Sequence, residues 1–108
     1  MRTPTWRVAL DQFTAELRGL YGSRLDAVIL YGSRARGDAD EASDVDTLIL
    51  LDPCADFWTE FERVSPIASR ISLEHDVVIS ALPADRRAFE KAGSPLFLNA
   101  HREGIRVA

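Results

Sequence analysis

Two short apolar segments, at 27–31 and 47–51, limit the possible folds more strongly than anything else in the chain. Gly32-Ser33 closes the first segment, and Asp44 and Asp46 lead into the second. Apolar runs of this length, bounded by turn residues, predict buried β-strands. On a strand, residues two apart point to the same face of the sheet. We therefore expect the two aspartate side chains to project together, beside a tight turn.

Helices and strands are expected to alternate along the rest of the chain. Helical spacing of apolar residues predicts a first helix, with Thr3 as a plausible N-cap and Gly22 as its end. A second helical stripe runs over 57–71, and Pro66 inside it predicts a kink or two short helices. The other expected elements are strands at 26–31, at 44–51 and from 74 or 75 to 81, helices at 33–37, 86–92 and 94–102, and a short strand at 105–107.

These elements indicate one domain, 1–108, of the α/β or α+β class. The segment 32–43 is at the margin of the length that a crossover between parallel strands needs. We therefore expect a mixed sheet of three to four strands with helices packed on it. The apolar run at 26–31 has no polar face, which is typical of an interior strand.

Net charge and cysteine content limit the binding partners and the cellular compartment that can be expected for this chain. The net charge of −4 gives no reason to expect direct nucleic-acid binding, and the apolar runs are too short to cross a bilayer. The first residues lack a signal-peptide pattern. The single cysteine, Cys54, excludes an internal disulfide and fits a reducing compartment. The expectation is a cytoplasmic protein without a membrane partner.

The turn and the aspartates together suggest chemistry on a nucleoside triphosphate. Glycine at position 32 lets a phosphate approach the backbone closely, and a helix that begins at Ser33 aims free N–H groups at it. Arg34 and Arg36 either reach phosphates or are solvated. Mg²⁺ prefers oxygen ligands, and two such ions can stabilise the entering and leaving oxygens of a phosphoryl group. The pair at 44 and 46 supplies carboxylates for such a site.

A third carboxylate on a neighbouring strand would complete the site. Asp76 is the candidate, because it begins the apolar run 76–79, which is expected to be a strand. Three converging carboxylates repel one another unless cations neutralise them. A metal centre formed by Asp44, Asp46 and Asp76 is the resulting hypothesis.

The stretch from Tyr31-Gly32-Ser33 to Asp44-Val45-Asp46 resembles the Gly-Ser-x10-Asp-x-Asp signature of the DNA polymerase β-like nucleotidyltransferase superfamily. It looks like the minimal (MNT-type) branch, and the similarity extends over nearly the full chain. The resemblance implies a nucleotidyltransferase palm in which Gly32 and Ser33 bind the triphosphate. It also implies that Asp44 and Asp46 bind two Mg²⁺ ions, with Asp76 as third carboxylate near the acceptor. Thr47 stands where the family usually has an aliphatic residue, and it is expected to face away from the aspartates.

Minimal members of this superfamily are paired with a helical HEPN toxin. The resemblance therefore implies an antitoxin that binds such a toxin and transfers AMP from ATP to a toxin tyrosine. We expect the acceptor to come from a partner chain or from a second copy of this chain, because no residues remain for a second domain. The apolar C-terminal segment suggests a partner surface that includes Phe89, Leu96, Phe97 or Leu98.

Two other functions stay open at this point. The first is an antitoxin that neutralises its toxin by binding alone. The second is a dimeric nucleotidyltransferase that modifies small molecules of the aminoglycoside type, although such enzymes carry an extra helical domain. The sequence identifies no residue that reads the base of the nucleotide.

Overall fold

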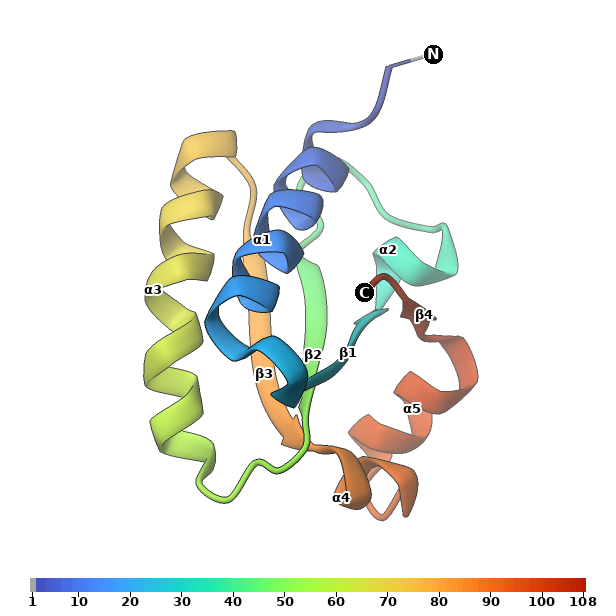
Figure 1. Ribbon diagram of the computed structural model, residues 1–108. Coiled ribbons are helices and arrows are strands. Elements are labelled where there is room, and N and C mark those ends of the chain that lie inside the picture. Colours follow the sequence, from blue (N-terminus) through green and yellow to red (C-terminus); the bar gives the residue numbers. More distant parts are fainter. Residues whose placement is uncertain (1) are drawn as a thin grey trace.

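The computed structural model describes residues 2–108 (Figure 1). Its elements in chain order are α1 (Thr5–Tyr21), the 3₁₀ turn η1 (Gly22–Arg24), β1 (Leu25–Tyr31), α2 (Ser33–Arg36), β2 (Val45–Leu51), α3 (Phe57–His75), β3 (Ile79–Asp85), α4 (Arg86–Glu90), α5 (Pro95–Glu103) and β4 (Ile105–Arg106). The expected alternation of helices and strands is confirmed.

The four strands form one mixed sheet in the order β3-β2-β1-β4. β1 is antiparallel to both β2 and β4, whereas β2 and β3 are parallel. The short segment between β1 and β2 is therefore compatible with the topology, because antiparallel neighbours need no crossover. β1 lies inside the sheet, as its continuous apolar run predicts. The parallel pair is joined by α3, the kind of crossover that parallel strands require.

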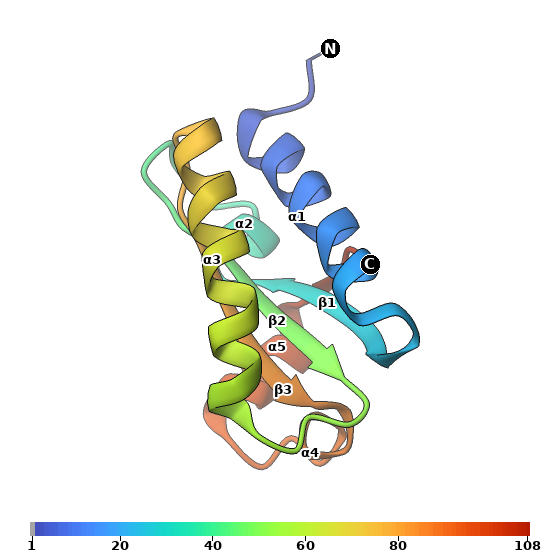
Figure 2. The same cartoon turned by 60° about the vertical axis from the view of Figure 1, so that its left-hand side comes forward.

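Helices cover the sheet on both faces, and the two faces differ. α1 and α3 lie side by side on one face, and α5 lies on the other (Figures 1 and 2). The larger core cluster is formed under α1 and α3 by apolar side chains such as Phe13, Leu30 and Ile49. The smaller cluster lies on the α4–α5 side and includes Leu48, Leu50 and Phe89. Only this second face carries the aspartate pair.

α3 differs from its prediction because it is one continuous helix through Pro66. Proline removes one backbone hydrogen bond from a helix interior. The helix continues because Val64, Ala68 and Ile71, on both sides of the proline, are buried in the larger core. The expectation of two short helices is wrong.

At the start of α1, Pro4 rather than Thr3 is the N-cap residue, and its carbonyl oxygen accepts a hydrogen bond from Val8 N.

β3 also differs from its prediction, because it spans 79–85 instead of ending before Leu82-Pro83. β3 is an edge strand, and Pro83 is tolerated there because a proline without an N–H costs no ladder hydrogen bond on the open side.

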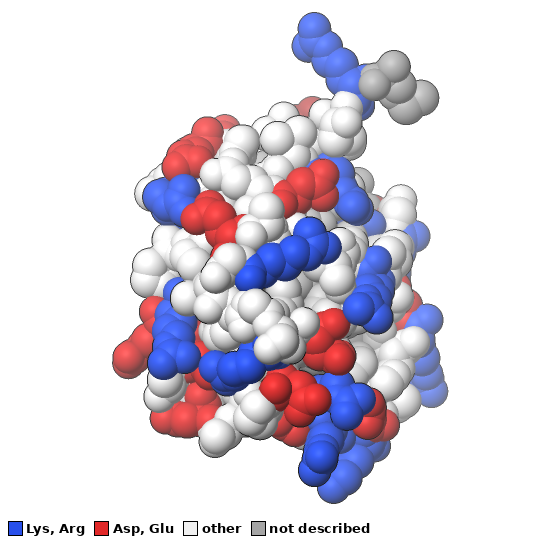
Figure 3. All heavy atoms as spheres, viewed as in Figure 1, with Lys and Arg blue, Asp and Glu red and all other residues white. Residues whose placement is uncertain are grey.

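Acidic and basic side chains are interspersed on the face viewed in Figure 3. No helix within residues 2–108 is long and apolar enough to span a membrane.

Candidate functional site

Asp44 and Asp46 lie at the start of β2, at the end of the sheet where β1 finishes. Asp46 is the second residue of β2, and Asp44 comes directly before the strand. In register, Asp46 lies opposite Tyr31 on β1 and Ser80 on β3. Residues directly opposite one another on paired strands share a face. Tyr31, Asp46 and Ser80 therefore form one row across three strands.

Asp44 lies two residues before Asp46, and its charge acts on the Asp46 carboxyl. Burial raises the pKa of the half-buried Asp46 carboxyl above its ordinary value, and the negative charge of Asp44 raises it further. The Arg36 guanidinium acts in the opposite direction and lowers it. A cation bound between the carboxylates would relieve both the desolvation and the repulsion. The donor set therefore fits Mg²⁺, which prefers carboxylate oxygens.

Gly32 is required in the turn beside this pair for two reasons. Its φ of +74° is one that side-chain-bearing residues rarely adopt. A Cβ at this position would also lie 2.5 Å from Asp46 Oδ2, well inside van der Waals contact. Glycine at this position therefore lets the Asp46 carboxylate lie directly against the turn.

α2 begins directly after Gly32, as the sequence predicts. Ala35 N and Arg36 N both donate to Gly32 O, at 3.1 and 3.0 Å. The amides of Ser33 and Arg34 precede these first helical hydrogen bonds, so they are the ones left for an anion. Gly37 ends the helix in the left-handed conformation, with φ of +84°.

Arg34 and Arg36 have different surroundings. Arg36 is exposed and forms ion pairs with Asp38 and Glu103, both at 3.1 Å. Arg34 packs over the Trp6 ring at 5.2 Å and donates to Ser43 O at 3.2 Å. Its Nε is buried without a hydrogen-bond partner among residues 2–108. Arg34 thus holds the loop that leads to Asp44, whereas Arg36 contributes positive charge near Asp46.

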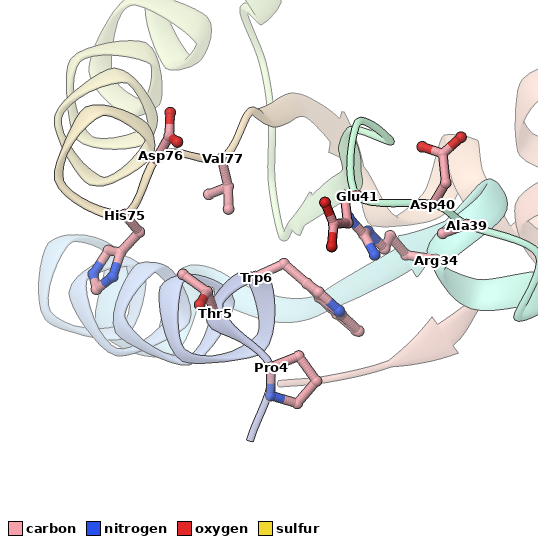
Figure 4. A pocket seen from close by; sticks show the side chains of 10 residues that line it. All are labelled: Pro4, Thr5, Trp6, Arg34, Ala39, Asp40, Glu41, His75, Asp76 and Val77. Carbon is pink, nitrogen blue, oxygen red and sulfur yellow. The ribbon is translucent and has the colours of Figure 1, made fainter. Parts of the chain in front are cut away.

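Asp76 is not on a strand, in contrast to the prediction. It is the C-cap of α3 in the left-handed conformation, with φ of +53°, and β3 begins three residues later. It lines a cavity of about 690 Å³ together with His75, Glu41, Trp6 and Arg34 (Figure 4). Asp44 and Asp46 do not line that cavity.

The described part of the chain holds no group of three His, Cys, Asp or Glu side chains that could bind a metal. The structure thus brings Asp44 and Asp46 together but does not add Asp76 to them. The position on β3 that shares a row with Asp46 belongs to Ser80. Sequence reasoning missed Ser80 because the strand was placed too early. Ser80, Leu82 and Ala84 recur at every second residue, and this spacing was the signal that could have identified Ser80 as part of the strand face.

Thr47 fixes the β2–β3 register next to this row. It is fully buried and faces away from the aspartates, as expected. Its hydroxyl donates to Ser80 O at 2.9 Å. An aliphatic side chain could not form this bond, so the hydroxyl adds a contact that holds Ser80 beside Asp46.

Sequence comparisons agree with this geometry. A family model described as "Polymerase beta, Nucleotidyltransferase" matches residues 19–94. Two proteins of Methanocaldococcus jannaschii, both named as candidate protein adenylyltransferases, are similar to the chain. MJ0141 is 42% identical over 73 residues, which is 68% of this chain and 73% of that protein. MJ0604 is 35% identical over 83 residues, which is 77% of each.

Solved structures share the fold at low sequence identity. A toxin–antitoxin crystallised with AMP-PNP has a TM-score of 0.63 at 18% identity, over 90% of this chain and 71% of that chain. A mutant of the toxin–antitoxin MntA-HpeT has a TM-score of 0.58 at 16% identity, over 91% and 71%. The family match covers the Gly32 turn, the aspartate pair and β3. The chain therefore belongs to the polymerase beta nucleotidyltransferase family and is a nucleotidyltransferase.

Proposed function

We propose that this protein is a Mg²⁺-dependent adenylyltransferase that acts as an antitoxin. It would bind a helical HEPN toxin and transfer AMP from ATP to a tyrosine hydroxyl of that toxin. The observation that carries the chemistry is the Asp44–Asp46 pair packed directly against the Gly32 turn. The names of the relatives support a protein acceptor, and the toxin–antitoxin neighbours support the partner.

Each residue of the site has a role in this proposal. Gly32 and Ser33 hold the triphosphate through backbone amides and the Ser33 hydroxyl. Asp44 and Asp46 would hold two Mg²⁺ ions, which when bound neutralise the triphosphate and lower the pKa of the acceptor hydroxyl. Arg36 offsets negative charge near Asp46.

The reaction forms one bond and breaks one bond. The acceptor oxygen bonds to the α-phosphorus, the bond from that phosphorus to its bridging oxygen breaks, and pyrophosphate leaves. The phenol proton passes to solvent. The proposal gives Asp76 no part in this step, because Asp76 is the C-cap of α3 and forms no three-carboxylate cluster with Asp44 and Asp46 in the described residues.

The test is to incubate the toxin partner with this protein and Mg-ATP and to measure the intact mass of the partner. We expect a mass gain of one AMP or more. The double variant Asp44→Asn, Asp46→Asn should abolish this gain while the complex still forms, because the substitutions remove two charges and little volume. If the double variant neutralised the toxin fully, binding alone would be the mechanism of the antitoxin.

A further inference from the structure

The sheet face that carries the aspartate pair is covered only in part. Its side chains form successive rows across β1, β2 and β3, namely Tyr31–Asp46–Ser80, Ile29–Leu48–Leu82 and Ala27–Leu50–Ala84. The third row is buried against α4 and α5. A cleft of about 410 Å³ lies on the β3 side of this face. It begins at the second row, with Leu48 and Leu82, and extends away from Asp46 to the end of β3, where Asp85, Cys54 and Phe57 line it.

The cleft is apolar. Leu48 and Leu82 form its floor, Leu96 and Phe97 of α5 form one wall, and Cys54 and Phe57 lie on another side. Asp85 also lines the cleft, but its carboxylate already accepts hydrogen bonds from three backbone amides, those of Cys54, Arg87 and Ala88. The cleft therefore favours an uncharged occupant.

One end of the cleft, at Leu48 and Leu82, is within reach of the carboxylate pair. Leu48 and Leu82 lie two residues along their strands from Asp46 and Ser80, so the second row is about 7 Å from the first. This distance is comparable to the length of an extended tyrosine side chain. An aromatic side chain that runs from the cleft along the sheet would bring its hydroxyl to Asp46.

The nucleotide and the acceptor would approach from opposite sides. Gly32 and Ser33 follow β1, which flanks β2 on the side away from β3. A triphosphate held there leaves the β3 side of Asp46 open to the acceptor. The cleft is on that β3 side, because Leu82, Pro83 and Ala84 all line it.

We propose that this cleft binds the acceptor segment of the partner protein, a tyrosine flanked by apolar side chains. The proposal rests on the proposed function and adds the place where the acceptor docks and the sequence type that it carries. It also corrects the expected partner surface. Phe89 is buried and stacks on His101 at 4.1 Å, so it belongs to the core, whereas Leu96 and Phe97 face the cleft.

Cys54 provides a built-in reporter, because it lines the cleft and is the only cysteine of the chain. We would measure the rate at which a disulfide reagent such as DTNB modifies Cys54 in the presence of short peptides. Acetyl-Leu-Tyr-Leu-amide and acetyl-Leu-Phe-Leu-amide should both protect the thiol, with a Kd on the order of 1 mM. At four times that concentration the rate should fall about fivefold. Acetyl-Gly-Tyr-Gly-amide should not protect it.

Leu96→Asp and Leu98→Asp form a matched pair of variants. Both positions are in the first turn and a half of α5, where a negative charge is compatible with the helix dipole, so both variants should fold. Leu96 lines the cleft, whereas Leu98 is 41% exposed and does not line it. Leu96→Asp should abolish protection of Cys54 by the peptides, and Leu98→Asp should leave it unchanged.

The same mixture with Mg-ATP separates docking from chemistry, because only the tyrosine peptide can gain AMP. Protection of Cys54 without AMP transfer would support the cleft and contradict the proposed function. AMP transfer without protection, and unaffected by Leu96→Asp, would support the function and overturn the cleft. Protection of Cys54 by Mg-ATP alone would place the adenine base in the cleft and overturn the proposal. The proposal would also be overturned if neither leucine-flanked peptide protected Cys54.

Discussion

Replacement of Gly32 by alanine adds a single methyl group beside the carboxylate pair. At φ of +74° a side-chain-bearing residue is strained, which costs about 1–3 kcal/mol. The added Cβ would also lie 2.5 Å from Asp46 Oδ2, so the carboxylate would have to move. We expect the free energy of unfolding to fall by about 2–3 kcal/mol, which lowers the Tm by roughly 10–20 °C in a domain of this size.

The Tm of the variant is measured by circular dichroism, and its affinity for Mn²⁺, as a probe for Mg²⁺, by electron paramagnetic resonance. Gly93→Ala is the matched control, because no atom lies within 4 Å of its added Cβ and its backbone is not in the positive-φ region. The double variant Gly32→Ala, Asp46→Ala removes the clash but keeps the backbone strain, so part of the lost stability should return. A Gly32→Ala protein with unchanged Tm and unchanged Mn²⁺ affinity would refute this account of the turn.

Two further predictions concern Glu60 and Ser80. Burial alone would raise the pKa of the Glu60 carboxyl, but hydrogen bonds from Arg24 at 2.6 Å and Tyr21 at 3.1 Å hold it below its ordinary value. A lowered pKa in the folded state adds stability above the unfolded value, near 4.5, and this stability is lost as the pH falls through the folded value. Urea unfolding across the acidic range should show this loss of stability in the wild type and a weaker loss in Glu60→Gln. At neutral pH the variant should be less stable than the wild type by about 1–3 kcal/mol. Equal pH profiles for the two proteins would contradict the role of Glu60. Ser80→Asp should raise the affinity for Mn²⁺ about tenfold or more in calorimetry, because it adds a carboxylate beside Asp46. The affinity of Asp76→Asn for Mn²⁺ should stay at the wild-type value. A loss of Mn²⁺ affinity in Asp76→Asn, with no gain in Ser80→Asp, would restore Asp76 as the third carboxylate.

The local sequence determined much of this protein. Alternation along β2 was enough to place Asp44 and Asp46 together, because the side-chain direction on a strand depends only on residue parity. The turn at Gly32 and the short helix after it were also predictable, since glycine is the residue that tolerates a positive φ. The mixed sheet followed from the length of the segment between the first two strands.

The tertiary structure decided which residue faces Asp46 from β3. The α3 helix continues to His75, since Ile71 is buried in the core and His75 is hydrogen-bonded to Gln12 of α1 at 2.8 Å, and this delays β3 to Ile79. Because β3 begins later than predicted, the residue of β3 that lies opposite Asp46 is Ser80 and not the expected Asp76. Strand pairing is set by contacts between distant segments, such as the bond from Thr47 to the Ser80 carbonyl, and local patterns carry no information on it.

The cleft, too, became visible only in three dimensions. Its floor comes from β2 and β3, one wall comes from α5, and Cys54 precedes α3, so segments far apart in the chain form it. The apolar residues at 96 and 97 read as a helix face from sequence, but their spacing could not tell which part of the sheet they would leave open. Periodicity fixes the face that a helix buries, whereas the shape that remains uncovered depends on how all the helices pack together.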